Sequence, residues 1–222
     1  MKKVLDYLSW EHVELGVRIS GCDKSFKGSM VIPDHINGVA VVEIGVWAFA
    51  ECEKITSVVL PDSVEVVGKR AFKDCSELEE LHLGAGLKKI EFEAFASCSS
   101  LKSVKIPGSV ESVGWFAFAS CFILEELHLG AGIKKIEDWA FASCCSLKSV
   151  EIPGTVESVG GYAFCDCAGL EELHLGAGIK KIEDCAFTGC SSLYKVVLPS
   201  TLEELSPDAF DESVDLVVDD DI

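Results

Sequence analysis

The sequence predicts a repeat solenoid built mostly of short parallel strands, and two recurring residue types support this prediction. Phenylalanine preceded by alanine recurs at one constant spacing along the chain, at Phe49, Phe72, Phe95, Phe118, Phe141, Phe164, Phe187 and Phe210. A cysteine follows three positions after each of the first seven, at Cys52, Cys75, Cys98, Cys121, Cys144, Cys167 and Cys190. A fixed period of this length is typical of coils that stack on one another and bury a continuous core.

Each coil begins with a strand motif, L-x-x-L-x-L. In one coil the apolar positions are Leu78, Leu81 and Leu83, and the next coil has Leu101, Val104 and Ile106 at the same places. Alternation at the end of the motif predicts a short strand with one face inward, so successive coils should form a parallel sheet. The strand should end at a turn that contains proline or glycine, as at Pro107 and Gly130.

The rest of the coil should close the cross-section on the opposite side. Two more apolar columns follow the turn, represented by Val110 and Val113, and the Ala-Phe pair comes next. We expect this pair on a tight turn, a 3₁₀ segment or one turn of helix. The rings of successive coils should then stack in the core, each contributing roughly 1.5–3 kcal/mol of hydrophobic stabilisation before entropy.

This 23-residue pattern, L-x-x-L-x-I-P-x-x-V-x-x-I-G-x-x-A-F-x-x-C, resembles the BspA-like leucine-rich repeat family over roughly residues 31–210. The resemblance implies a leucine-rich repeat solenoid, α/β-type but mostly β, that is curved and right-handed. Members of the family occur in bacterial and protist surface proteins, and several are associated with adhesion. The family has no shared catalytic residues.

The chain divides into three predicted parts. Residues 1–40 should form an N-terminal capping hairpin and the first coil, because the segment VELGVRIS alternates. Residues 41–210 hold the leucine-rich repeats, and residues 211–222 form an acidic C-terminal cap. Charged residues there would discourage a further coil from docking. An acidic recognition tail is the alternative interpretation of the last aspartates.

The formal net charge of −18 favours a protein partner, including one with a basic surface, over nucleic acid or anionic lipid. No run of 18 apolar residues is present, so we expect no membrane insertion. The first residues do not form a signal peptide, which favours a cytoplasmic location for the chain as written. Removal of a signal peptide would instead indicate a secreted or cell-surface protein.

Exposed charges alternate between coils, because the coils come in two kinds and every second coil is of the same kind. One column reads Glu65, Lys88, Glu111, Lys134, Glu157, Lys180 and Glu203, and another reads Glu79, Lys102, Glu125, Lys148 and Glu171. Each charge should therefore have opposite charges about one strand spacing, ~4.8 Å, away. We interpret both columns as structural, since they avoid stacks of like charge and fix the register.

Neither a catalytic site nor a metal or cofactor site is expected. The cysteine column should consist of buried, reduced thiols that act as small apolar side chains. His82, His128 and His174 share one column but lie two strands apart, about 9.6 Å. That spacing is too long for one zinc ion, whose nitrogen ligands lie at ~2.0–2.1 Å. No nucleophile elbow, P-loop, H-E-x-x-H or C-x-x-C motif is present.

Two surfaces are candidates for partner binding. The first is an edge rich in aromatic residues, comprising Phe92, Trp115, Phe116, Phe122, Trp139 and Tyr162. These rings either complete the core at the coil edge or form a contact patch for a partner or a second copy. The second is the concave strand face, with candidates Glu80, His82, Lys105, Glu126, His128, Glu151, Glu172 and His174.

The sequence therefore favours a non-catalytic protein–protein interaction module. A secreted or surface adhesin-type module is one alternative, favoured if a signal peptide is encoded. A structural or designed repeat scaffold is another, favoured because the segment LEELHLGAGIKKIE occurs identically at 124–137 and 170–183.

Overall fold

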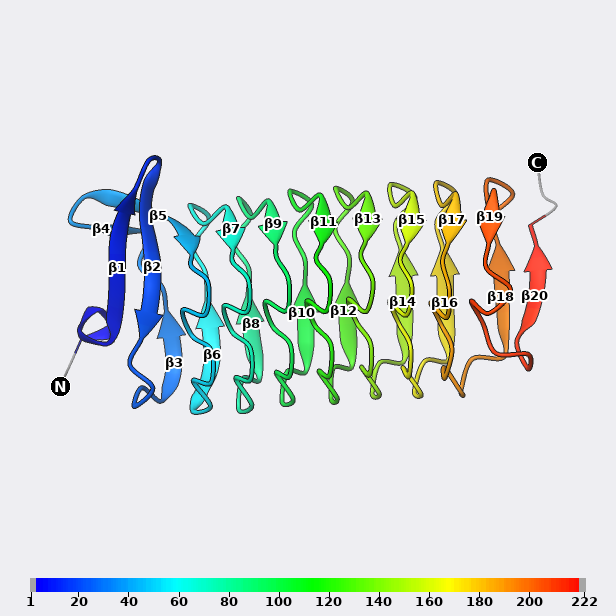
Figure 1. Ribbon diagram of the computed structural model, residues 1–222, viewed down its shortest axis with the longest axis horizontal. Helices are drawn as coiled ribbons and strands as arrows, with labels where there is room; N and C mark the ends of the chain where they lie inside the picture. Colours follow the sequence, from blue (N-terminus) through cyan, green and yellow to red (C-terminus); the bar gives the residue numbers. More distant parts are fainter. Residues whose placement is uncertain (1–2, 220–222) are drawn as a thin grey trace.

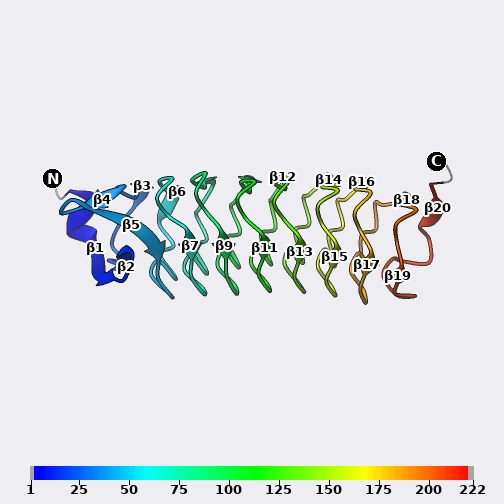
Figure 2. The same ribbon diagram turned by 90° about the horizontal axis from the view of Figure 1, so that it is seen from above.

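The computed structural model describes residues 3–219 as one elongated stack of coils. The coils follow one another in a nearly straight row in both views, with the N-terminal hairpin at one end and the last strand at the other (Figures 1 and 2). The strand face that was expected to be concave is therefore almost flat. This architecture confirms the predicted leucine-rich repeat solenoid with parallel strands.

Strands of the L-x-x-L-x-L motif form the first row along the stack, and their parallel pairing is divided into three groups of neighbouring strands (Figure 1). Its members are β3 (Gly28–Val31), β6 (Ile55–Val59), β8 (Glu80–His82), β10 (Ser103–Lys105), β12 (Glu126–His128), β14 (Ser149–Ile152), β16 (Glu172–Leu175), β18 (Lys195–Leu198) and β20 (Asp215–Val218). Ser103 pairs with Glu126 and Val104 with Leu127, so the register advances by one whole repeat per coil.

A second row of two-residue strands lies on another side of the coils, as Figure 2 shows. It continues β5 (Val39–Ile44) through β7 (Val66–Val67), β9 (Lys89–Ile90), β11 (Ser112–Val113), β13 (Lys135–Ile136), β15 (Ser158–Val159), β17 (Lys181–Ile182) and β19 (Glu204–Leu205). The sequence indicated two apolar columns here but not strands. Two residues are too few to show alternation, so the sequence pattern did not predict this second row of strands.

The N-terminal end differs from the coils. A 3₁₀ helix, η1 (Val4–Tyr7), precedes the antiparallel hairpin of β1 (Leu8–Val13) and β2 (Gly16–Cys22). β2 then pairs in parallel with β5, and β4 (His35–Ile36) pairs antiparallel with β5. Within residues 3–219, no helix has the length and apolar character needed to span a bilayer.

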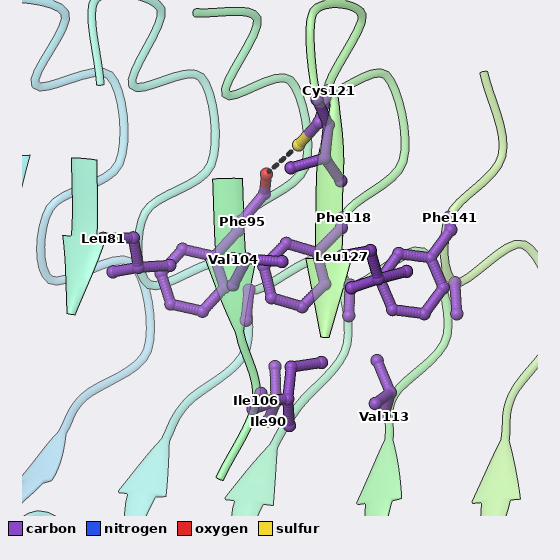
Figure 3. Close-up of a cluster of buried hydrophobic side chains, with 14 of the residues drawn as sticks. Leu81, Ile90, Phe95, Val104, Ile106, Val113, Phe118, Cys121, Leu127 and Phe141 are labelled. Carbon is purple, nitrogen blue, oxygen red and sulfur yellow. Dashed lines mark hydrogen bonds between the residues drawn. The ribbon is translucent and has the colours of Figure 1, made fainter. Parts of the chain in front are cut away.

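The phenylalanine spine runs through the whole repeat region. Consecutive rings from Phe49 to Phe210 stack with centroids 4.7–5.4 Å apart and planes within 12° of each other. Figure 3 shows Phe95, Phe118 and Phe141 in this arrangement, with Val104 and Leu127 of the first row packed beside them. The predicted stacking of residues one repeat apart is thus confirmed.

The Ala-Phe segment is a hydrogen-bonded turn and not a helix. The Phe95 amide donates to the Ala117 carbonyl of the next coil at 2.8 Å, and the Phe118 amide donates to Ala140 at 2.8 Å. Residues two positions before and after each phenylalanine from Phe49 to Phe187 have positive φ values, as at Trp139 (61°) and Ser143 (60°). Of the forms expected from the sequence, the turn is the one present.

The charge columns form ion pairs between neighbouring coils. Lys88 Nζ lies 2.8 Å from Glu65 Oε1, and Lys180 Nζ lies 3.6 Å from Glu157 Oε2 in the same column. In the other column, Lys102 Nζ lies 2.6 Å from Glu79 Oε2. Alternation of charge from coil to coil therefore places opposite charges side by side, as expected.

The C-terminal end is an open edge strand. β20 pairs only with β18 among the described residues, and all four of its residues are exposed. The Asp219 amide donates to the Leu198 carbonyl at 2.9 Å, which continues the pairing by one residue. Asp220 and Asp221, on which the predicted acidic protection also depends, lie outside the described residues. The three-part division of the chain remains a prediction.

Candidate interaction surfaces

Three of the predicted aromatic residues form a stacked surface column, which we call the aromatic ladder: Phe116, Trp139 and Tyr162. The Phe116 and Trp139 rings are 5.6 Å apart with planes 8° from parallel. The Trp139 and Tyr162 rings are 4.2 Å apart and 5° from parallel. Phe92 meets Phe116 edge to face at 6.0 Å. The ladder therefore continues over neighbouring coils as one apolar strip.

The backbone of the turn positions these rings. Each ladder residue lies two positions before a spine phenylalanine and has φ between 57° and 61°. The amide of Trp139 donates to the Gly161 carbonyl at 3.0 Å, and that of Tyr162 donates to the Asp184 carbonyl at 2.9 Å. These bonds hold successive ladder residues one coil apart. A residue other than glycine in this left-handed region costs roughly 1–2 kcal/mol.

The ladder is separate from the core. Its rings are half-buried, whereas the spine phenylalanines from Phe49 to Phe187 are 0% exposed. The half-buried apolar residues that pack against the core are other side chains, such as Leu129 and Leu175. The ladder rings stack on one another and are not among these residues, so the core is complete without them.

Trp115 and Phe122 differ in how they relate to the ladder. Trp115 is 52% exposed, donates its indole N–H to Glu137 Oε2 at 2.8 Å, and shares a shallow hollow with Phe92. Phe122 is 47% exposed and makes no ring contact within residues 3–219. The structure thus brings five of the six aromatic candidates together and leaves Phe122 apart.

The ladder column contains a cationic site nearer the N-terminus that sequence reasoning missed. The Arg70 guanidinium lies 4.8 Å from the centre of the Trp47 ring and 5.0 Å from that of Phe92. Arg70 Nε also donates to Glu93 Oε2 at 2.7 Å, and Lys73 Nζ lies 2.6 Å from the same oxygen. These two cations hold the pKa of the Glu93 carboxyl below its usual value against the opposing effect of burial. The repeat spacing could have revealed this site, because Trp47, Arg70 and Glu93 occupy the same position in successive coils.

A groove of about 650 Å³ lies beside the C-terminal end of the ladder, and we call it the acidic groove. Trp139 and Tyr162 form part of its wall. Its charged lining residues are Asp138, Lys181, Glu183, Asp184, Glu203 and Glu204. Lys181 Nζ lies 3.5 Å from Glu183 and 3.3 Å from Glu204, and Asp184 Oδ1 accepts from Ser206 Oγ at 2.6 Å. Negative charge therefore exceeds positive charge in this groove.

The other candidate surface, the strand face, is the outward side of the first row. All eight of its predicted residues are exposed, and the register places Lys105 beside His128 and Glu151 beside His174. His174 Nε2 lies 4.0 Å from Glu172 Oε2. No group of three His, Cys, Asp or Glu side chains in residues 3–219 is arranged to hold a metal ion. The strand face is a flat, mixed-charge surface.

Comparisons with known proteins agree with this geometry. A profile described as "BspA type Leucine rich repeat region", in six copies, matches residues 22–144 and 116–217. A leucine-rich repeat protein from T. pallidum is 31% identical over 85% of this chain and 88% of its own, with a TM-score of 0.80. Among curated proteins, none matches significantly.

Two further solved structures match this chain at lower identity, and the first of them shares the fold. The pneumococcal vaccine antigen PcpA is 17% identical over 88% of this chain and 77% of its own, with a TM-score of 0.56. A leucine-rich cell surface protein from Faecalibacterium prausnitzii is 18% identical over 96% of this chain and 93% of its own, with a TM-score of 0.49.

Proposed function

The chain belongs to the BspA-type leucine-rich repeat family, and from this premise we propose that it is a non-catalytic protein-binding module. The single observation that supports this most is the aromatic ladder. Trp and Tyr are enriched among the residues that dominate binding energy in protein interfaces. A contiguous strip of rings on a protein with a net charge of −18 is otherwise an unusual surface.

The position of the rings relative to the core also supports the proposal. The left-handed conformation of residues 116, 139 and 162 recurs at the same position in other coils, as at Arg70 and Glu93, so it belongs to the repeat and not to the ladder alone. What distinguishes these three coils is that aromatic side chains occupy the position. Since the core is complete without these rings, their contribution to folding is small compared with that of the phenylalanine spine.

The strand face is the weaker of the two candidates. Its exposed residues alternate between acid, base, serine and histidine, as solvated strands do. Exposed charges of this kind contribute little binding energy individually, since such pairs are worth about 0–1 kcal/mol. We therefore assign partner contact to the ladder edge, from Phe92 to Tyr162.

The proposal includes a reducing compartment, as in the cytoplasm. All eleven cysteines are free thiols. Six thiols of the repeat column donate hydrogen bonds to phenylalanine carbonyls inside the core, from Cys75 to Cys190. Free thiols in such number are typical of reducing compartments.

The test is affinity capture of partner proteins from the source organism with the wild-type chain and with a Trp115→Ser/Trp139→Ser variant. We expect the variant to lose the captured partner while its urea unfolding changes by less than about 1 kcal/mol, because neither ring belongs to the core. Sedimentation of the purified chain detects a second copy acting as the partner.

Two control variants make the test specific. Tyr194→Ser removes an aromatic ring that is 74% exposed and directly precedes β18, away from the ladder, and should leave capture unchanged. A triple His82→Ala/His128→Ala/His174→Ala variant examines the strand face. Capture lost in the histidine variant but retained in the tryptophan variant would contradict the assignment to the ladder. A large loss of stability in the tryptophan variant would show instead that the rings complete the core.

A further inference from the structure

The ladder ends at Tyr162, and no other ring within residues 3–219 stacks on it from the C-terminal side. The next residue in the column is Cys185, a small side chain whose hydrogen bond with the Tyr162 hydroxyl raises the pKa of that tyrosine. Tyr162 also lines the acidic groove. One end of the aromatic stack therefore borders an open, negatively charged space.

The same column shows what fills such a space elsewhere in this chain. One coil after Trp47 comes Arg70, whose guanidinium lies over the Trp47 ring at 4.8 Å, and Glu93 one coil further on accepts its Nε–H. One coil after Tyr162 the column holds Cys185 instead of an arginine. The Tyr162 end thus has a terminal ring and nearby carboxylates but lacks the cation that completes the N-terminal arrangement.

We propose that the acidic groove binds an arginine side chain of a partner protein, with the guanidinium against the Tyr162 ring and its N–H groups toward the Asp184 and Glu183 carboxylates. This proposal rests on the proposed protein-binding function and specifies the chemistry of the partner. The groove volume of about 650 Å³ lies within the ~300–1,000 Å³ range of ligand sites.

Charge complementarity supports a cation as the occupant. Five carboxylates and one ammonium group line the groove, and Lys181 pairs with only two of the carboxylates, Glu183 and Glu204. Asp184 is exposed and its known side-chain partner is the neutral Ser206 hydroxyl. A planar guanidinium stacks on an aromatic face and donates to carboxylates at the same time, which a lysine ammonium does less well.

The experiment measures binding of a short capped peptide of alternating glycine and arginine by isothermal titration calorimetry, with lysine and citrulline versions as comparisons. The wild-type chain should bind the arginine peptide about threefold or more tightly than the lysine peptide. It should not bind the citrulline peptide, which keeps the shape but removes the charge. Tyr162→Ala should weaken arginine-peptide binding about five- to tenfold.

Matched variants separate stacking from general charge attraction. Tyr194→Ala removes an equivalent ring outside the groove and should change the affinity less than about twofold. Asp184→Asn should weaken binding and reduce its dependence on salt, because one charge of the site is lost. Unchanged melting curves for all three variants establish that the fold is intact.

Three results would overturn the proposal. Equal affinities for the arginine and lysine peptides, together with no effect of Tyr162→Ala, would mean that net charge alone attracts the peptide. Absence of binding by the wild-type chain would exclude an arginine site. Binding of a neutral oligosaccharide at Tyr162 without binding of the arginine peptide would identify a sugar site instead. The wild-type chain could fail to bind the arginine peptide while the Trp115→Ser/Trp139→Ser variant still loses a captured protein. That result would support the protein-binding function and exclude only the arginine site.

Discussion

The Cys121 thiol donates a hydrogen bond to the Phe95 carbonyl of the preceding coil, with sulfur and oxygen 3.5 Å apart (Figure 3). The Phe95 carbonyl also accepts the Cys98 amide at 3.3 Å, so both of its acceptor sites are used. The same thiol-to-carbonyl bond recurs along the column. Cysteine here combines a small apolar side chain with a buried hydrogen-bond donor. Alanine and valine side chains are apolar but have no donor.

The adjacent residues Cys144 and Cys145 test this role directly. Cys144 is 0% exposed and bonds to the Phe118 carbonyl at 3.5 Å, whereas Cys145 is exposed. We expect Cys144→Ala to lower the free energy of unfolding by about 1–3 kcal/mol, through a cavity and a lost hydrogen bond. Cys145→Ala should change it by less than about 0.5 kcal/mol. Urea denaturation compares them, and equal losses would refute a special role for the column.

Because the column thiols are buried, we expect the protein to lose stability at alkaline pH. Desolvation raises the pKa of Cys121 to about 12 and the pKa of Cys98 well above its usual value. The folded state then retains protons that the unfolded chain releases above about pH 8.5. Stability from these thiols is therefore complete below that pH and is lost as pH rises toward 12.

The measurement is urea denaturation at pH 7 to 10.5, for the wild-type chain and for Cys121→Ala. Each buried thiol should add a slope on the order of 1 kcal/mol per pH unit above pH 9. The variant should lose less stability over this range than the wild-type chain. Tyrosine and lysine ionise identically in both proteins, so they cancel in the comparison. Parallel pH profiles would contradict the prediction.

Two glycines in neighbouring coils test the close approach between coils of the two kinds. A Cβ atom added to Gly132 would overlap the Gly108 carbonyl oxygen, whereas one added to Gly108 would have its nearest neighbour, the Ala131 nitrogen, at 3.9 Å. Gly132→Ala should therefore cost about 1–3 kcal/mol or more, because backbone has to move. Gly108→Ala should stay within about 1 kcal/mol. Thermal melting ranks the two variants. Equal melting temperatures would mean that the backbone near residue 132 moves away from Gly108 without loss of stability.

Reversing one charge tests the alternating columns. Lys180 pairs with Glu157 and lies between Glu157 and Glu203 in its column. Lys180→Glu should lower stability by about 0.5–1 kcal/mol at low salt, since it places three like charges in succession. The loss should shrink in 1 M NaCl, where the Debye length is about 3 Å. Lys27→Glu, an equal charge change at an exposed lysine outside the column, is the control. A loss that is the same at both sites would exclude the column effect.

The sequence alone determined which residues lie above one another. A translation by one repeat moves each side chain to the equivalent place in the next coil, so columns can be read directly from the chain. The phenylalanine spine, the thiol column, the alternating charges and the parallel first row all follow from this translation. The apolar columns can then be assigned to the core, because stacked apolar side chains are stabilised by removal from water.

Only the tertiary structure decided how columns lie relative to one another within a coil. The left-handed conformation at residues such as Trp139 and Tyr162 is not encoded by glycine, so residue type gave no sign of it. That conformation aligns the ladder rings face to face. It also sets Arg70 over Trp47. Backbone torsions inside one coil are local geometry, and a period between coils contains no information about them.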